Sequence, residues 1–222
     1  MFINLENGIK LHYEIIGAGE PLLLLHGNGD SLEGLKKLGQ ALASHYKVYL
    51  IDSRGHGMSS NHNEVVDYPD FAEDIDLFIK QLNLDKVNII GHSDGAIISA
   101  LMAMEGKAYL NKIVLLGISL NFEQMRDVWK NWVYNEYEKT NHHPLIKLIL
   151  EKPNIKMSDL SKIKIPTYVV AGERDIIDTH LYFEMAETIE NSDILILKGE
   201  NHSSYIIDND MFAKYALSFL KK

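Results

Sequence analysis

The sequence predicts an α/β protein whose central sheet is mostly parallel and flanked by helices. Short apolar runs at 22–25, 48–51 and 113–116 lack the polar alternation of half-exposed strands, so they suit strands buried on both faces. Helix-like segments separate these runs along the chain, and strands that alternate with helices indicate βαβ units. A chain of 222 residues can bury one sizeable core. We therefore expect a single domain over residues 1–222.

The first elements are expected to form an antiparallel hairpin, ahead of the parallel part of the sheet. Residues 2–6 and 9–16 are rich in apolar side chains. They flank Asn7-Gly8, a dipeptide favoured in tight hairpin turns.

The rest of the chain continues the alternation of helix and strand. A helical stretch over 32–43 follows a glycine-rich turn, and Asp30 or Ser31 can cap it. Residues 68–82 carry apolar side chains at a helical spacing. Besides the runs already named, the expected strands lie at 87–90, 167–171 and 194–197, and the further helices at 96–102, 178–190 and 203–220.

One segment, residues 121–164, is too long for a simple helical crossover between two strands. The side chains expected to form one helical face in it are Phe122, Met125, Trp129, Trp132 and Val133. Residues 145–150 make a second apolar stretch. We interpret the segment as a small helical cap inserted over the strand ends, with Trp129 and Trp132 lining a substrate pocket, and not as a second domain.

Composition narrows the classes of partner and chemistry. The formal net charge of −9 argues against nucleic acid or an anionic membrane as the main partner. The absence of cysteine excludes a disulfide framework, a cysteine nucleophile and thiolate metal sites. No apolar run approaches the ~20 residues that span a bilayer, and the N-terminus lacks the pattern of a signal peptide, so a cytoplasmic location is expected.

The pentapeptide Gly91-His92-Ser93-Asp94-Gly95 joins an apolar strand-like run to a helix-like run. Gly-x-Ser-x-Gly in that context predicts a nucleophile elbow, a sharp turn that lifts the Ser93 hydroxyl out of the sheet. Such a turn leaves no room for a Cβ at Gly91 or Gly95. The N-terminus of the following helix favours an anion that forms beside it. The alternative is an ordinary strand–helix turn with a surface serine.

Further motifs follow expected strands, at the sheet edge where parallel sheets bind their ligands. The order Ser93, Asp175, His202 along the chain is the order of the catalytic triad in α/β-hydrolases. The sequence resembles that superfamily over its whole length. Besides the elbow, the segments that carry the resemblance are His26-Gly27, residues 52–59 (Asp-Ser-Arg-Gly-His-Gly-Met-Ser), Gly172-Glu173-Arg174-Asp175 and Asn201-His202. A serine at the elbow argues against the branches that use aspartate there, the dehalogenases and epoxide hydrolases.

The resemblance implies a role for each residue of the site. Ser93 would attack the substrate, His202 would act as base, and Asp175 would orient the imidazole and stabilise its charged form. The backbone N–H groups of Asn28 and Asp94 would form the oxyanion hole, their side chains being incidental to this role. Neither a cofactor nor a metal is expected, and no metal-binding spacing such as His-Glu-x-x-His occurs.

Two assignments stay open. Asp178 lies shortly after Asp175 and could be the acid instead, although it is better placed to cap the helix that follows. His142-His143 could contact substrate, but a solvated cap loop is the simpler interpretation. The motif residues interpreted as structural are His26 and His56, which orient loops, His92, which packs, and Arg54, which forms a loop salt bridge.

The sequence thus predicts a serine hydrolase that cleaves a small carboxylic ester, and that small molecule is its expected partner. Thioester, amide, lactone and carbon–carbon substrates stay open, because the same triad serves all of them. The rival functions are a ligand-binding regulator on the same fold, with slow or no turnover, and a cofactor-free perhydrolase. The sequence leaves the oligomeric state open.

Overall fold

A single sheet forms the centre of the molecule in the computed structural model, which describes residues 1–61 and 67–222. Within these residues eight strands pair in the order β1-β2-β4-β3-β5-β6-β7-β8. The strands are β1 (Phe2–Asn4), β2 (Lys10–Ile16), β3 (Pro21–Leu25), β4 (Lys47–Ile51), β5 (Val87–His92), β6 (Leu110–Leu116), β7 (Thr167–Arg174) and β8 (Ser192–Asn201). β2 pairs antiparallel with β1 and β4, and the remaining neighbours are parallel. The predicted fold class and the N-terminal hairpin are therefore confirmed.

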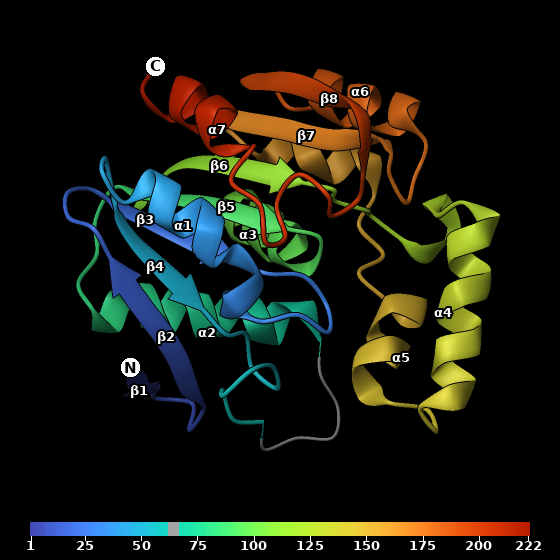
Figure 1. Cartoon of the computed structure of the whole chain (residues 1–222), viewed down its shortest axis with the longest axis horizontal. Helices are drawn as coiled ribbons and strands as arrows, with labels where there is room; N and C mark the ends of the chain where they lie inside the picture. Colours follow the sequence, from blue (N-terminus) through green and yellow to red (C-terminus); the bar gives the residue numbers. More distant parts are fainter. Residues whose placement is uncertain (62–66) are drawn as a thin grey trace.

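Helices cover both faces of this sheet (Figure 1). One face carries α2 (Tyr68–Gln81), α3 (Asp94–Met104) and α6 (Thr179–Thr188). The other carries α1 (Lys36–Leu42) and α7 (Ala213–Leu220). Among the helices in the described ranges, none is both long enough and apolar enough to cross a membrane.

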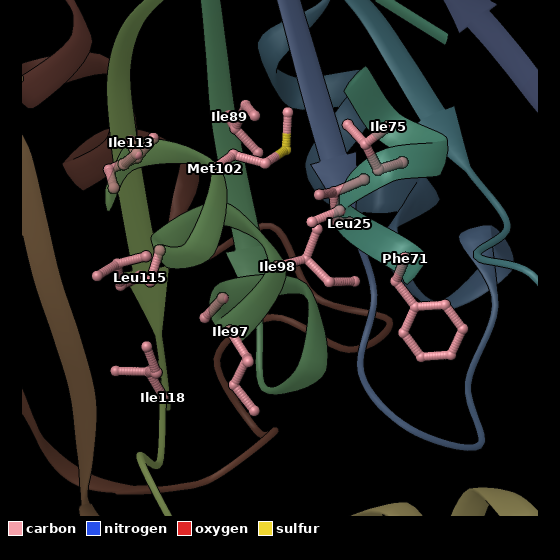
Figure 2. Close-up of a cluster of buried hydrophobic side chains, with 14 of the residues drawn as sticks. Leu25, Phe71, Ile75, Ile89, Ile97, Ile98, Met102, Ile113, Leu115 and Ile118 are labelled. Atoms are coloured by element: carbon pink, nitrogen blue, oxygen red, sulfur yellow. The ribbon is translucent and has the colours of Figure 1, made fainter. Parts of the chain in front are cut away.

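Alternate residues of β3 enter opposite sides of the core. Leu23 and Leu25 pack in the cluster with α2 and α3, whereas Leu22 and Leu24 pack in the cluster with α1 and α7. All of these side chains are 0% exposed. Burying one leucine stabilises the fold by about 1.5–3 kcal/mol, so burial on both faces explains the unbroken apolar run. Figure 2 shows the first cluster, whose labelled side chains are Leu25, Phe71, Ile75, Ile89, Ile97, Ile98, Met102, Ile113, Leu115 and Ile118.

Two helices between β6 and β7 stand apart from those that cover the sheet. They are α4 (Asp127–Lys139) and α5 (Pro144–Glu151). In Figure 1 they form a pair beside the main body, on the side toward which the arrow of β6 points. Side chains of both helices line a cavity that also contains Ser93, at the end of β5. The structure therefore puts this pair next to the sheet edge where ligands are expected.

The expectation of one continuous helical face starting at Phe122 is wrong, because α4 begins only at Asp127. Phe122 belongs to a short 3-10 turn, and Met125 is extended and forms a β-bridge with Ile177. The next residue, Arg126, donates its N–H to the carbonyl of Ile176, which precedes Ile177, at 2.9 Å. These contacts with the segment after β7 use backbone groups that would otherwise form the hydrogen bonds of a longer helix.

The closing helix expected over 203–220 is also shorter, since α7 starts at Ala213. The Asn209 side chain donates to the Ser204 carbonyl at 2.7 Å and accepts from the Met211 N–H at 2.9 Å. Such bonds offer the backbone an alternative to a helix, and they account for the turns that precede α7.

The stretch expected as a helix over 32–43 is a 3-10 turn, Leu32–Leu35, that continues into α1. The expected cap by Asp30 or Ser31 is wrong, because neither side chain caps this turn. Instead, the Leu32 N–H donates to the carboxylate of Asp52, with a distance of 2.8 Å to Oδ1. A residue from the loop after β4 therefore fixes the start of the helix that follows β3.

Candidate active site

Ser93 stands at the turn between β5 and α3. Its backbone angles are φ 53° and ψ −112°, a positive-φ conformation that is rare for a residue other than glycine. The Ser93 N–H donates to the Leu116 carbonyl of β6 at 2.8 Å, and the Gly95 N–H donates to the His26 carbonyl at 3.1 Å. Neighbouring segments thus hold a conformation that costs about 1–3 kcal/mol, as is usual at functional sites.

The two glycines of the pentapeptide are required by close backbone approach. A Cβ on Gly91 would lie 2.1 Å from the carbonyl oxygen of Gly95. A Cβ on Gly95 would lie 2.2 Å from the carbonyl oxygen of Leu25 in β3. Neither oxygen belongs to a flexible side chain that could turn away. The steric reason predicted for both glycines is therefore confirmed.

Gly95→Ala is expected to lower the free energy of unfolding by at least about 1–3 kcal/mol, the usual cost of overpacking. The new methyl group must displace the backbone of β3 or of α3. The measurement is urea unfolding, with Gly39→Ala as the matched control. At Gly39 the nearest atoms are the side-chain ends of Ile16 and Leu50, at 3.2 Å, and these can move. Equal losses in the two variants would contradict the close approach at Gly95.

Asp175 and His202 form a pair just after the ends of β7 and β8, with the aspartate buried and the histidine half-buried. The His202 Nδ1 lies 2.6 Å from Asp175 Oδ1, and the aspartate is 0% exposed. Asp175 also accepts from the N–H groups of Ile176 at 2.7 Å and Gly172 at 3.0 Å. Burial raises the pKa of Asp175, but His202 and these donors outweigh it and hold the pKa below its ordinary value. The pair therefore leaves Nε2 as the free ring nitrogen of His202.

Two tyrosines near Asp175 were not singled out from the sequence. Tyr182 on α6 and Tyr205 after β8 are both 0% exposed. Burial and the nearby Asp175 carboxylate raise the pKa of both hydroxyls well above the ordinary value. Both hydroxyls thus stay protonated beside the carboxylate. Sequence spacing gives no sign of this, because Tyr182 reads as an ordinary core position of a helix.

Asp178, the alternative acid, has a different partner. Its Oδ1 lies 2.8 Å from the Arg126 Nε, and its side chain is 60% exposed. It occupies the N-cap position of α6 but makes no capping hydrogen bond with its side chain. The expectation that it caps this helix through its side chain is therefore wrong, and the structure pairs His202 with Asp175.

Asn28 follows β3 and Asp94 opens α3, so both lie beside Ser93. Within residues 1–61 and 67–222, neither main-chain N–H donates to a protein acceptor. The side chains, by contrast, are bonded to each other, because Asn28 Nδ2 donates to Asp94 Oδ2 at 3.0 Å. Tyr68 donates its hydroxyl to Asp94 Oδ1 at 2.8 Å. Burial raises the pKa of the Asp94 carboxyl, although the Tyr68 and Asn28 donors oppose the rise.

A cavity of about 180 Å³ brings these groups together with the helices α4 and α5. Ser93, His202 and Asn28 line it, as do both tryptophans expected in the pocket. Trp132 is 47% exposed, so it lies at the mouth, whereas Trp129 is half-buried. The other lining residues are Tyr68, Asp94, Ile97, Ser119, Met125, Val133, Ile149, Lys152, Pro153, Ile176 and Ser203. The polar residues among these that the sequence analysis did not place in the pocket are Tyr68, Ser119, Lys152 and Ser203.

The three histidines of the strand-end motifs are buried, and each bonds to the backbone. His92 Nε2 lies 2.9 Å from the His202 carbonyl oxygen, and burial together with nearby His202 lowers the pKa of His92 to about 3. His26 accepts from the Ser53 N–H at 3.0 Å, and burial, with His56 nearby, lowers the pKa of His26 to about 4. His56 Nδ1 lies 3.0 Å from the Arg54 carbonyl oxygen. These contacts fit the structural roles predicted for them.

The remaining polar residues singled out from the sequence lie away from the cavity lining. Arg54 binds both carboxylate oxygens of Asp74 at 2.6 Å, which is the salt bridge predicted for it. His142 stacks on Tyr137, and the exposed His143 accepts from the first turn of α5. Among the described residues, no group of His, Asp and Glu side chains could hold a metal ion.

The family profile described as alpha/beta hydrolase fold matches residues 20–142 of this chain. The matched region contains His26-Gly27, the pentapeptide 91–95 and α4, the first of the two helices beside the cavity. The chain therefore belongs to the α/β-hydrolase family, as its sequence motifs predicted.

Several relatives of this chain are named as hydrolases. Human serine hydrolase BPHL is 27% identical over 250 residues, covering 97% of this chain and 84% of that protein. The (E)-2-((N-methylformamido)methylene)succinate hydrolase of Acinetobacter baylyi is 32% identical, over 51% of this chain and 43% of that protein. Among solved structures, an esterase from Exiguobacterium antarcticum superposes with a TM-score of 0.87 at 22% identity, covering 100% of this chain and 99% of that chain. That likeness establishes the fold, and the family and its relatives support a hydrolase activity.

Proposed function

We propose that this protein is a serine hydrolase that cleaves a small carboxylic ester through an acyl-enzyme on Ser93. The observation that carries the proposal is the shared cavity: Ser93, in its positive-φ turn, and His202, paired with buried Asp175, both line it. A serine hydroxyl is a weak nucleophile that needs a nearby base, and in this proposal His202 is that base.

Each step of the reaction has a residue suited to it. His202 Nε2 takes the Ser93 proton as Oγ attacks the ester carbonyl carbon, and Asp175 stabilises the imidazolium that forms. The N–H groups of Asn28 and Asp94 donate to the oxyanion of the tetrahedral intermediate. His202 then protonates the departing alcohol, leaving an acyl group on Ser93. A water molecule, deprotonated by His202, attacks the acyl carbon; the bond to Ser93 Oγ breaks as His202 returns the proton to Oγ, and the acid is released.

We propose that residues 121–164 act as a small cap within the single domain and set the length of the acyl group. The cavity of about 180 Å³ is small beside the roughly 300–1,000 Å³ of sites for drug-sized ligands. Trp129 and Val133 of α4 and Ile149 of α5 give it apolar walls. Trp132, at the mouth, limits its extension toward solvent.

The test is the value of kcat/KM for p-nitrophenyl esters from acetyl to decanoyl. We expect acetyl or butyryl esters to exceed decanoyl by about tenfold or more, the scale of discrimination by pocket size. Trp129→Ala, and to a smaller extent the more exposed Trp132→Ala, should shift the optimum to longer chains while the melting temperature changes little. An optimum at long chains in the wild type would contradict the size argument. Stable ligand binding without turnover of any ester would favour the regulator.

A further inference from the structure

The Asn28 side chain has two neighbours that are far apart in the sequence. Its Nδ2 donates to Asp94 Oδ2 at 3.0 Å and to the Leu145 carbonyl oxygen at 3.0 Å. A side-chain amide nitrogen has two hydrogens, so both are used. One bond reaches the residue next to Ser93, and the other reaches the first turn of α5.

A second connection joins the other end of α5 to the same carboxylate. Lys152 follows α5 directly, and its Nζ lies 2.7 Å from Asp67 Oδ2. Asp67 Oδ1 accepts from the N–H of Tyr68 at 2.8 Å, at the start of α2. The hydroxyl of Tyr68, which is 1% exposed, donates to Asp94 Oδ1 at 2.8 Å. Both ends of α5 are therefore linked to the Asp94 carboxylate, one through Asn28 and the other through Asp67 and Tyr68.

We propose that Asn28 is a positioning residue that couples the seating of α5 to the oxyanion hole. The inference rests on the proposed function, because the N–H groups that it positions are those of Asn28 and Asp94. With α5 seated, the Asn28 side chain is held from two sides, and its own N–H and that of Asp94 are fixed together. When α5 lifts, the bond to Leu145 is lost, and the Asn28 side chain is held from one side.

This coupling matters for catalysis because oxyanion donors act by being in place before charge develops. Removing one such donor costs about 10²–10³ in kcat, and a misplacement of about 1 Å can cost on the order of 10². If only the main-chain N–H of Asn28 mattered, Asn28→Ala would keep full activity, because alanine has the same N–H. In Asn28→Ala the buried Asp94 oxygen and the Leu145 carbonyl would each lose a donor.

The experiment compares Asn28→Ala with the matched control Asn111→Ala. Asn111 is also half-buried and also donates its Nδ2 to a side-chain oxygen, that of Asn88 at 3.0 Å, but it lies on β6 outside the cap and does not line the cavity. Readouts are kcat and KM on p-nitrophenyl acetate, the inhibition constant of a trifluoromethyl ketone, the melting temperature, and hydrogen exchange over residues 144–151. The ketone adds to the serine hydroxyl and forms an oxyanion, so its affinity reports the hole directly.

Asn28→Ala should lower kcat by about 10- to 100-fold, with KM within about twofold, and weaken the ketone by the same factor as kcat/KM. Hydrogen exchange in α5 should become faster. The isosteric Asn28→Asp, which brings a carboxylate against Asp94, should lose at least as much activity. Asn111→Ala should match the wild type in all of these except the melting temperature.

Two outcomes would overturn the inference while leaving the proposed function intact. One is an active wild type with unchanged kcat and ketone affinity in Asn28→Ala and Asn28→Asp. The other is a loss of activity without faster exchange in α5, which would separate Asn28 from the cap. A wild type that neither turns over esters nor binds the ketone would instead overturn the proposed function, and this inference with it.

Discussion

Ser93→Ala is expected to lower kcat for p-nitrophenyl acetate by up to about a millionfold, the scale seen when a triad serine is removed. Alanine removes the attacking oxygen but keeps the apolar cavity, so KM should change far less than kcat. The loss should be this large because a triad acts as a unit, and without the nucleophile the base has no proton to take. The remaining activity would come from substrate binding and the oxyanion donors alone.

A fluorophosphonate that reacts with activated serines gives an independent measurement. Mass spectrometry should place the adduct on the peptide that contains Ser93, and Ser93→Ala should not be labelled. Ser53→Ala is the matched control, since Ser53 is buried and lies outside the cavity lining. It should keep both labelling and turnover. An adduct on another residue, or activity in Ser93→Ala close to that of the wild type, would show that the nucleophile lies elsewhere.

The parallel core of the sheet could be predicted because its central strands are covered on two faces. β3 and β4 are almost wholly buried, so their sequences are unbroken apolar runs that no exposed strand would have. The elbow could be predicted for a local reason. Gly91 and Gly95 are fixed by contacts with backbone oxygens, and those contacts come from the strand–turn–helix geometry itself.

The starts of α4 and α7 could not be predicted, because other hydrogen bonds, long-range at α4 and local at α7, outweighed the apolar spacing. Met125 pairs with Ile177, and Asn209 bonds to its neighbours, and neither preference appears in a helical pattern of apolar side chains. In both places the pattern marks which residues are buried, and the backbone partners decide whether they lie on a helix.

Within the site, residues that directly follow a strand could be predicted. Contacts between residues far apart in the sequence could not. The bond from Asn28 to Leu145 joins residues separated by 117 positions, and no spacing rule spans that distance. The same is true of Tyr68, whose hydroxyl reaches Asp94 from α2. The sequence marks the positions of Asn28 and Asp94 through their motifs, but it treats their side chains as incidental. The structure shows a hydrogen bond between these side chains, and our proposal gives that bond a positioning role.

Asp175→Asn is expected to lower kcat by about 10⁴-fold, the scale known for this change in a catalytic triad. The reason lies in the donors that surround the carboxylate. Oδ1 accepts from His202 and Ile176, and Oδ2 accepts from Gly172. Because an amide has a single oxygen, asparagine can satisfy the donors on one side only.

Both orientations of the amide are unfavourable for catalysis. With its oxygen toward His202, the neutral amide no longer stabilises the imidazolium, and its NH₂ faces the Gly172 N–H. With its NH₂ toward His202, Nδ1 must accept, so Nε2 carries the proton and cannot take one from Ser93. The measurement is kcat on p-nitrophenyl acetate beside Asp178→Asn, whose side chain is exposed and paired with Arg126. Asp178→Asn should lose less than about tenfold, because an exposed ion pair contributes little. A larger loss in Asp178→Asn than in Asp175→Asn would move the role of the acid to Asp178.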